Sequence, residues 1–156
     1  MRFLKFAANN NYRKSNSILS INFKPKEESR LFALEILTTQ NHIQRQVIGE
    51  NLLKSLSDDA KVSHVKLKIS ATRQWSKKRV GRTVFKLYGY YRTKTKYVYI
   101  QNLTSVRGKP VAAKTFLNTL IHEWLHHYDT EKLKLHSIHT KGFYLRLSSL
   151  KDSLSL

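Results

Sequence analysis

The most constraining feature of the sequence is a segment from Ala113 to Tyr128 or Asp129, in which large apolar residues recur at helical spacing. These residues are Phe116, Leu117, Leu120, Ile121, Trp124, Leu125 and Tyr128. They cover a broad surface rather than a narrow stripe, as is typical of a helix packed under a sheet. The segment therefore predicts the central helix of a domain that also contains a β-sheet.

Other apolar patterns predict the elements around this helix. Helical spacing predicts one or two helices between Glu27 and Leu56, ending before a turn at Ser57, and a last helix over Thr140–Leu150. Strand-like patterns occupy residues 65–70, 83–91 and 97–103, with a polar, basic connection over 72–82. The last two strands predict a hairpin with a basic tip at 92–96. This order predicts an α+β domain with a small three-stranded sheet.

The N-terminal part of the chain shows only weak periodicity. Basic residues are frequent there, and no acidic residue precedes Glu27. We expect a basic arm over residues 1–25, extended or partly ordered, with a short strand at Ile18–Phe23. A single domain over residues 26–156 is expected to follow, because 156 residues suit one domain of ordinary size.

The chain contains no cysteine, which excludes disulfides, a thiol nucleophile and cysteine-based zinc fingers. Any metal site must therefore use histidine and carboxylate ligands. The absence of cysteine fits a reducing compartment, so we expect a cytoplasmic protein, with association with the nucleoid as an option. The sequence has no apolar run long enough to predict a membrane span.

The central helix carries an H-E-x-x-H motif, His122-Glu123-Trp124-Leu125-His126. Residues four apart lie one turn apart on the same helical face, so the two imidazoles can converge on one ion. Glu123 lies beside the first ligand, where its carboxylate can take a proton from a zinc-activated water. The alternative interpretation is an amphipathic helix whose imidazoles are only solvated.

A catalytic zinc needs a third protein ligand. We favour His139, because it begins the expected last helix and shares a face with Phe143. His136, in the preceding loop, is the alternative ligand. His127 points about 100° away from its neighbour His126, so it is expected to be exposed or to lie behind the ligands.

The H-E-x-x-H motif, followed by His139-Thr140-Lys141-Gly142-Phe143, resembles the SprT-like (Spartan-like) zinc metallopeptidase domain, whose later histidine precedes a phenylalanine in the form H-x-x-x-F. The similarity covers roughly residues 60–150 and extends to a small bacterial and phage branch. It implies a minimal gluzincin-like fold, Zn²⁺ bound by His122, His126 and His139, and Glu123 as general base. Better-known relatives cleave proteins crosslinked to DNA, and many carry a cysteine-containing zinc module that this sequence lacks.

The chain is strongly basic, with 29 Lys and Arg against 10 Asp and Glu and a net charge of +19. No acidic residue lies between Asp59 and Glu123, whereas tyrosines and cations alternate there. This pattern favours non-specific contact with DNA or RNA, although strand tyrosines also pack across a sheet. The candidate contacts are Lys77, Lys78, Arg79, Arg82, Arg92, Lys94 and Lys96.

The leading hypothesis is a zinc-dependent metallopeptidase that hydrolyses a protein or peptide substrate, with DNA-associated proteins as one substrate class. Asp129, on the same helical stripe as the motif histidines, is a candidate to orient an imidazole. Tyr144, Arg146 and a hairpin tyrosine are candidates to stabilise the oxyanion. The alternative is a basic nucleic-acid-binding module whose metal is structural or absent.

Overall fold

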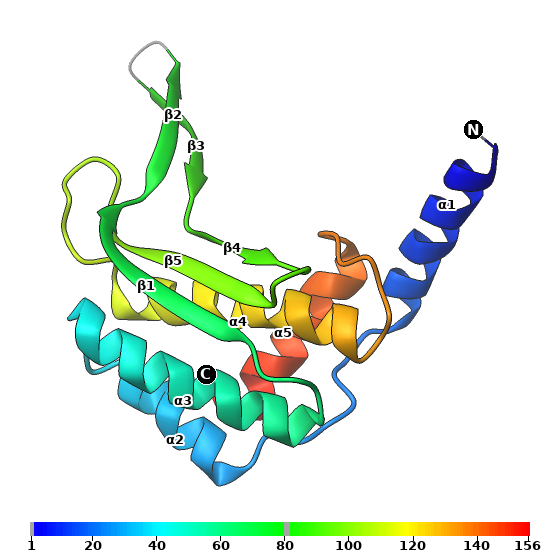
Figure 1. Ribbon diagram of the computed structural model, residues 1–156, viewed down its shortest axis with the longest axis horizontal. Helices are drawn as coiled ribbons and strands as arrows, with labels where there is room; N and C mark the ends of the chain where they lie inside the picture. The colour runs from blue at the N-terminus through cyan, green and yellow to red at the C-terminus, as the bar shows by residue number, and fades with distance from the viewer. Residues whose placement is uncertain (1, 80–81) are drawn as a thin grey trace.

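The computed structural model describes residues 2–79 and 82–156, with side chains described for residues 4–75 and 88–156. Figure 1 shows its helices and strands. The helices are α1 (Arg2–Ser17), α2 (Glu27–Ile36), α3 (His42–Ala60), α4 (Ala113–Glu131) and α5 (Lys141–Ser153). The strands are β1 (Lys66–Arg73), β2 (Trp75–Arg79), β3 (Arg82–Leu87), β4 (Gly89–Arg92) and β5 (Tyr97–Leu103). The predicted α+β class is confirmed.

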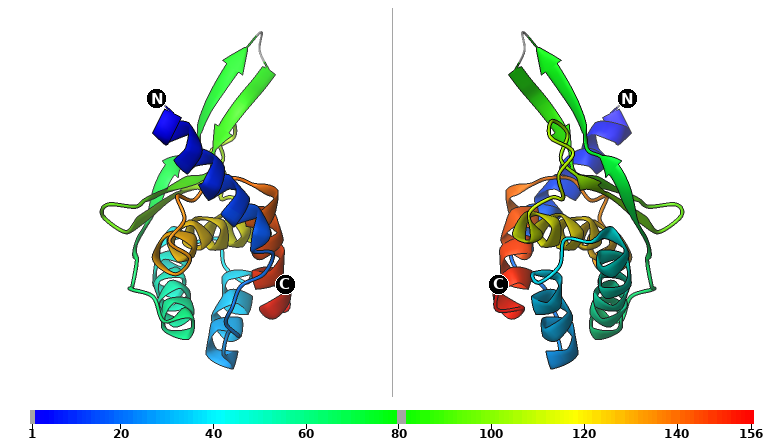
Figure 2. Two further views of the ribbon diagram at one scale, coloured as in Figure 1. Left: turned by 90° about the vertical axis from the view of Figure 1, so that its right-hand side faces the viewer. Right: turned by 90° about the vertical axis from the view of Figure 1, so that its left-hand side faces the viewer.

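The main sheet has three strands in the order β1-β5-β4. β1 runs parallel to β5, and β4 pairs antiparallel with β5, so a hairpin in this region is confirmed. Its first strand is shorter than the expected 83–91, because β3 ends at Leu87 and belongs to another sheet, and Arg92 lies in β4 rather than in the tip. The polar, basic connection expected over residues 72–82 contains β2, which pairs antiparallel with β3. This separate two-stranded ribbon rises on the side opposite α2 and α3 (Figures 1 and 2).

Helices α3 and α4 pack against one face of the main sheet. Val98 and Ile100 of β5 are buried toward them, together with Phe116, Leu120 and Trp124 of α4. The strand predicted over 65–70 is confirmed by burial of Leu67 and Ile69 between exposed lysines in β1. In β5 every second residue is buried. Burial of this apolar surface stabilises α4 directly beneath the sheet, which fixes the direction in which the histidine motif points.

The helices expected between Glu27 and Leu56 were predicted to end before a turn at Ser57. This end is wrong, because α3 continues to Ala60. Ser57 is buried within the helix, where its hydroxyl donates to the Leu53 carbonyl at 2.7 Å and accepts from the Trp124 indole at 3.0 Å. The helix ends instead at Lys61, whose φ of 56° is left-handed. A serine that normally favours a turn is thus held in the helix by α4.

The N-terminal segment also differs from the expectation. It forms helix α1, whose first half projects from the rest of the molecule while its last turns contact α5 (Figure 1). Residues 18–23 form no strand. The sequence pattern is weak because few side chains of α1 are buried, Ser15 among them. In the described part of the chain, no helix has the length and apolarity needed to cross a membrane.

Candidate metal centre

Three imidazoles converge where α4 faces the start of α5. His122 and His126 lie one turn apart on α4, and His139 comes from the loop that precedes α5. The Nε2 atom of His139 lies 3.0 Å from Nε2 of His122 and 3.0 Å from Nε2 of His126. The structure therefore brings together the three residues that were predicted to bind metal.

The spacing of these nitrogens fits a tetrahedral metal ion. Zinc binds imidazole nitrogen at about 2.0–2.1 Å, which places two ligands of a tetrahedron roughly 3.3 Å apart. All three ligand atoms lie within 4.8 Å of one another, close enough to share one ion. Imidazole is a preferred ligand of zinc, and three protein ligands leave a fourth position for water or substrate. The donor set thus fits Zn²⁺.

His126 is held in the tautomer that a metal ligand needs. Its Nδ1 lies 2.7 Å from the Ser137 hydroxyl, and that hydroxyl donates to the Asp129 carboxylate at 3.2 Å. Because the single hydroxyl proton is used on Asp129, the Ser137 oxygen accepts the proton on Nδ1 of His126. The lone pair of His126 then lies on Nε2, facing the other two imidazoles.

Asp129 is itself fixed by a buried ion pair. Arg146 donates to its two carboxylate oxygens at 2.9 and 2.7 Å, and both side chains have 0% exposure. Burial raises the pKa of Asp129, and the bonds from Arg146 oppose that rise. Asp129 therefore orients an imidazole as predicted, through Ser137. Arg146 lies behind the ligands and supports Asp129, rather than facing the cleft as an oxyanion partner would.

The environment keeps two of the ligands neutral. Burial, reinforced by the neighbouring His139, lowers the pKa of His122 to about 4. Burial and the adjacent His122 and His139 lower the pKa of His126 to about 3. At neutral pH both rings are therefore uncharged, and the lone pair on one nitrogen of each ring is available to a cation.

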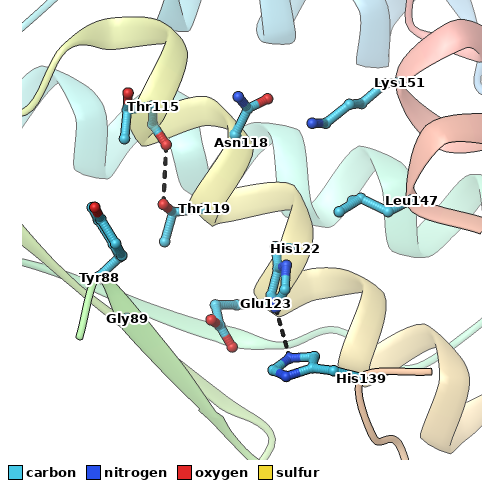
Figure 3. Close-up of a pocket in the computed structure, with 10 residues that line it drawn as sticks. All are labelled: Tyr88, Gly89, Thr115, Asn118, Thr119, His122, Glu123, His139, Leu147 and Lys151. Carbon is cyan, nitrogen blue, oxygen red and sulfur yellow. Dashed lines mark hydrogen bonds between the residues drawn. The ribbon is translucent and has the colours of Figure 1, made fainter. Parts of the chain in front are cut away.

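Glu123 lies beside this centre without being part of the ligand set. Its side chain points to the same side of α4 as the His139 ring (Figure 3). The residue is 9% exposed, and burial raises the pKa of its carboxyl to about 7. A carboxyl with this pKa can both accept and donate a proton near neutral pH.

Two clefts meet at the centre. One, of about 440 Å³, is lined by Tyr88, Gly89, Thr115, Asn118, Thr119, His122, Glu123, His139, Leu147 and Lys151 (Figure 3). The other, of about 300 Å³, is lined by Gly89, Tyr90, Tyr91, Thr93, Glu123, His126, Thr130, His136, Ser137 and His139. Gly89, Glu123 and His139 border both clefts. A second polypeptide lying extended along β4 would therefore pass the three imidazoles, with one cleft on either side of them.

Aromatic rings pack against the imidazoles. Phe143 stacks on His126, with ring centroids 4.5 Å apart, and it packs edge-to-face with His122 at a centroid distance of 5.0 Å. Tyr144 is 52% exposed, and its ring lies 5.9 Å from that of His139. Tyr144 thus lies beside His139 but lines neither cleft. Of the hairpin tyrosines that were the other candidates, Tyr90 and Tyr91 line the second cleft.

The other histidines take different places. His136 is exposed and does not join the three-imidazole cluster. His127 is fully buried, so of the two alternatives expected for it, an exposed position is excluded. Its Nδ1 accepts from the Tyr91 hydroxyl at 2.9 Å, and its Nε2 donates to the Ser63 carbonyl at 2.6 Å. His139 does not begin the last helix, since α5 begins at Lys141 and Thr140 caps it.

The sequence reasoning missed Ser137, because a lone serine in a loop has no periodic signal. Of the predicted nucleic-acid contacts, Arg92 packs its guanidinium over the Tyr90 ring at 5.0 Å, and Lys94 is exposed. Lys96 is paired with Glu131 at 3.2 Å. The side chains of Lys77, Lys78, Arg79 and Arg82 lie outside the described residues.

Comparison of the chain with protein-family models, curated proteins and solved structures finds no match. The resemblance to SprT-like peptidases therefore remains an expectation based on two histidine motifs. The features of the molecule that bear on function are the three converging imidazoles, the buried carboxylate of Glu123 and the two clefts beside them.

Proposed function

We propose that the chain is a zinc-dependent peptidase in which His122, His126 and His139 hold the ion and Glu123 acts as general base. The observation that carries the proposal is the convergence of three Nε2 atoms beside a buried carboxylate. Glu123 is the one carboxylate among the side chains that line the two clefts. A solvated surface cluster of histidines would not need the hydrogen bonds that fix His126.

Zinc bound at this centre would lower the pKa of a water molecule to about 7 and polarise a substrate carbonyl. Glu123 accepts a proton from the attacking water as the new carbon–oxygen bond forms. It then donates that proton to the amine nitrogen as the carbon–nitrogen bond breaks. Its raised pKa, near 7, supports both roles. Tyr144, whose ring lies 5.9 Å from that of His139, and Tyr90, which lines the second cleft, are the candidates to donate a hydrogen bond to the developing oxyanion.

An extended peptide is the substrate that fits the clefts. β4 pairs with β5 along one side and lies at the edge of the sheet, so its other edge can pair with a substrate backbone. Gly89 of β4 borders both clefts. A Cβ at this position would lie 2.8 Å from the Tyr99 carbonyl, so the close packing of β4 here needs glycine.

Hydrolysis of a labelled unfolded protein by the zinc-loaded chain tests this function. We expect Glu123→Gln to lower the rate at least 100-fold, the lower end of the range for general acid–base catalysis, while zinc content stays unchanged. Glu131→Gln, the same substitution near the end of the same helix, is the control and should retain activity. Full activity in Glu123→Gln, or no activity in the zinc-loaded wild type, would contradict the proposal.

A second candidate function, single-stranded nucleic-acid binding, is favoured by the outer face of the sheet. Two cross-strand rows lie there, Lys68-Tyr99-Tyr90 and Lys66-Tyr97-Arg92. The Tyr90 and Tyr99 rings stack 5.2 Å apart with an interplanar angle of 17°. Exposed cations beside a tyrosine platform suit phosphates and unstacked bases.

We expect a labelled oligothymidine to bind this face with strong salt dependence, independently of zinc. Tyr99→Ala should weaken binding at least about fivefold, since one base stacked on an aromatic ring contributes roughly 1–3 kcal/mol. Tyr12→Ala, which changes an exposed tyrosine of α1, is the control. Equal affinity of the two variants in fluorescence anisotropy would argue against this surface. Binding of nucleic acid without any zinc-dependent hydrolysis would favour a binding module over a peptidase.

A further inference from the structure

The loop that carries His139 is held from outside by the N-terminal helix. This loop runs from the end of α4 at Glu131 to the start of α5 at Lys141, and it also supplies Ser137. Within it, Leu135 is buried and His139 is exposed. A loop of this kind needs external contacts to keep a metal ligand in place.

Asn11 of α1 forms two hydrogen bonds with the backbone of His136. Its side-chain amide donates to the His136 carbonyl at 2.8 Å, and its Oδ1 accepts from the His136 amide at 2.9 Å. One turn further, Lys14 donates to the Leu133 carbonyl at 2.6 Å. These bonds replace the backbone partners that an irregular segment lacks.

The last turn of α1 fixes the other side of His139. The Ser15 and Thr140 hydroxyls lie 2.7 Å apart, and the Asn16 side chain accepts from the Gly142 amide at 2.8 Å. Thr140 also caps α5, so the hydrogen bond between Ser15 and Thr140 connects α1 to the residue at which α5 begins. His139 therefore lies between two points, His136 and Thr140, that α1 holds.

A second connection runs from α1 to His126. Arg146 donates to the carbonyls of Ser15 and Ile18 at 2.7 and 2.6 Å. The same guanidinium holds Asp129, which accepts from the Ser137 hydroxyl that positions His126. Two of the three candidate ligands are thus connected to α1, by different routes.

Helices α1 and α5 pack closely against each other at Gly142. A Cβ on Gly142 would clash with the Ser15 carbonyl oxygen, so only glycine permits this packing of α1 on α5. By contrast, Leu4, Phe6 and Tyr12 of α1 are exposed. The described part of α1 is therefore held mainly by polar contacts to the metal-binding region rather than by the apolar core.

We propose that α1 is a positioning element of the metal centre, with Asn11 and Ser15 as positioning residues for His139. The inference rests on the proposed metal site. Docking of α1 and binding of zinc are then coupled, and by linkage each stabilises the other to the same extent. Undocking of α1 would leave the third ligand free to move and would weaken zinc binding without changing any ligand.

Asparagines at positions 10 and 11 provide a matched test. Asn10 is exposed and Asn11 bonds to the loop, so Asn11→Ala and Asn10→Ala change the same residue type on the same helix. We expect Asn11→Ala to weaken zinc affinity roughly tenfold, as removal of residues that hold metal ligands commonly does, and Asn10→Ala to leave it unchanged. Affinity is measured on the full chain by competition with a chromophoric chelator.

A spectroscopic readout separates positioning from a general loss of stability. At saturating Co²⁺, the visible absorption of Asn11→Ala should differ from that of the wild type, because a mobile His139 alters the coordination geometry. Asn10→Ala should match the wild type. Equal zinc affinities and equal spectra in the two variants would overturn the proposal, although the proposed peptidase function would stand. A wild type that binds no zinc would overturn both.

Because docking of α1 and binding of zinc should stabilise each other, the coupling can also be tested without a substitution in α1. Zinc should slow amide hydrogen exchange of residues 11–17 in the wild type and have no such effect in His139→Ala. If zinc binds to the wild type but leaves exchange of this segment unchanged, α1 and the metal centre are uncoupled and the proposal is wrong.

Discussion

Replacement of Arg146 by methionine provides a quantitative test of the support behind the ligands. The guanidinium is fully buried and forms hydrogen bonds to Asp129, to the Ser15 hydroxyl and to the carbonyls of Ser15 and Ile18. Methionine has a similar length but no donor. The substitution leaves the Asp129 carboxylate buried without its cation, and leaves two carbonyls of the α1 end without this donor.

The expected cost follows from this geometry. Removing one partner of a buried ion pair costs about 3–5 kcal/mol, because the remaining charge stays uncompensated. That is a large share of a total stability of about 5–15 kcal/mol. At roughly 2–4 °C per kcal/mol for a domain of this size, the midpoint of thermal unfolding should fall by about 6–20 °C.

The assay is urea unfolding followed by circular dichroism, with the metal removed by chelator so that only the fold is measured. Arg30→Met is the control, because Arg30 pairs with Glu27 on the exposed surface, where an ion pair contributes at most about 1 kcal/mol. In the double variant with Asp129→Asn, the loss should be smaller than the sum of the two single losses. A loss below about 1 kcal/mol in Arg146→Met, equal to that of the control, would refute the role assigned to this pair.

Three further predictions follow from the same structure. Zinc at about 100 times its dissociation constant should raise the free energy of unfolding by about 2.7 kcal/mol, and His139→Ala should lose most of this gain in thermal unfolding with and without chelator. Gly142→Ala should displace the end of α1, since its Cβ would meet the Ser15 carbonyl; hydrogen exchange at residues 15–17 should accelerate, whereas Ser148→Ala on the same helix should have no effect. Burial, aided by Glu131, raises the pKa of Tyr91 from 10.0 to about 12. The unfolded chain therefore releases a proton that the folded chain keeps, so stability should fall as pH rises above about 10, and urea midpoints should fall less steeply in Tyr91→Phe.

The parts of the fold that were predicted correctly depend on local patterns. The apolar spacing around Trp124 identified α4, and the alternation around Ile69 identified β1. The four-residue spacing of His122 and His126 likewise follows from helix geometry alone. Each of these features is decided by residues within about two turns or one strand, which is the range that periodicity reports.

The parts that were missed depend on contacts between distant residues. Helix α1 is docked by hydrogen bonds between residues that are 119 or more positions apart, such as Lys14 with Leu133 and Ser15 with Thr140. Arg45 is another example: it is fully buried and donates to the Asn102 side chain and the Val111 carbonyl, both at 2.7 Å. A basic residue on a helix normally predicts exposure. Such pairings leave no periodic signal, so the sequence could not show that α1 belongs to the metal centre.

In the proposed site, His122, His126 and His139 bind one zinc ion. The decisive measurement is the amount of metal per chain by mass spectrometry after dialysis, in the wild type, His139→Ala and His136→Ala. We predict about one zinc per chain in the wild type and in His136→Ala, because His136 lies outside the cluster, and a marked loss in His139→Ala. Absence of zinc from the wild type, or equal zinc content in His139→Ala, would contradict this account.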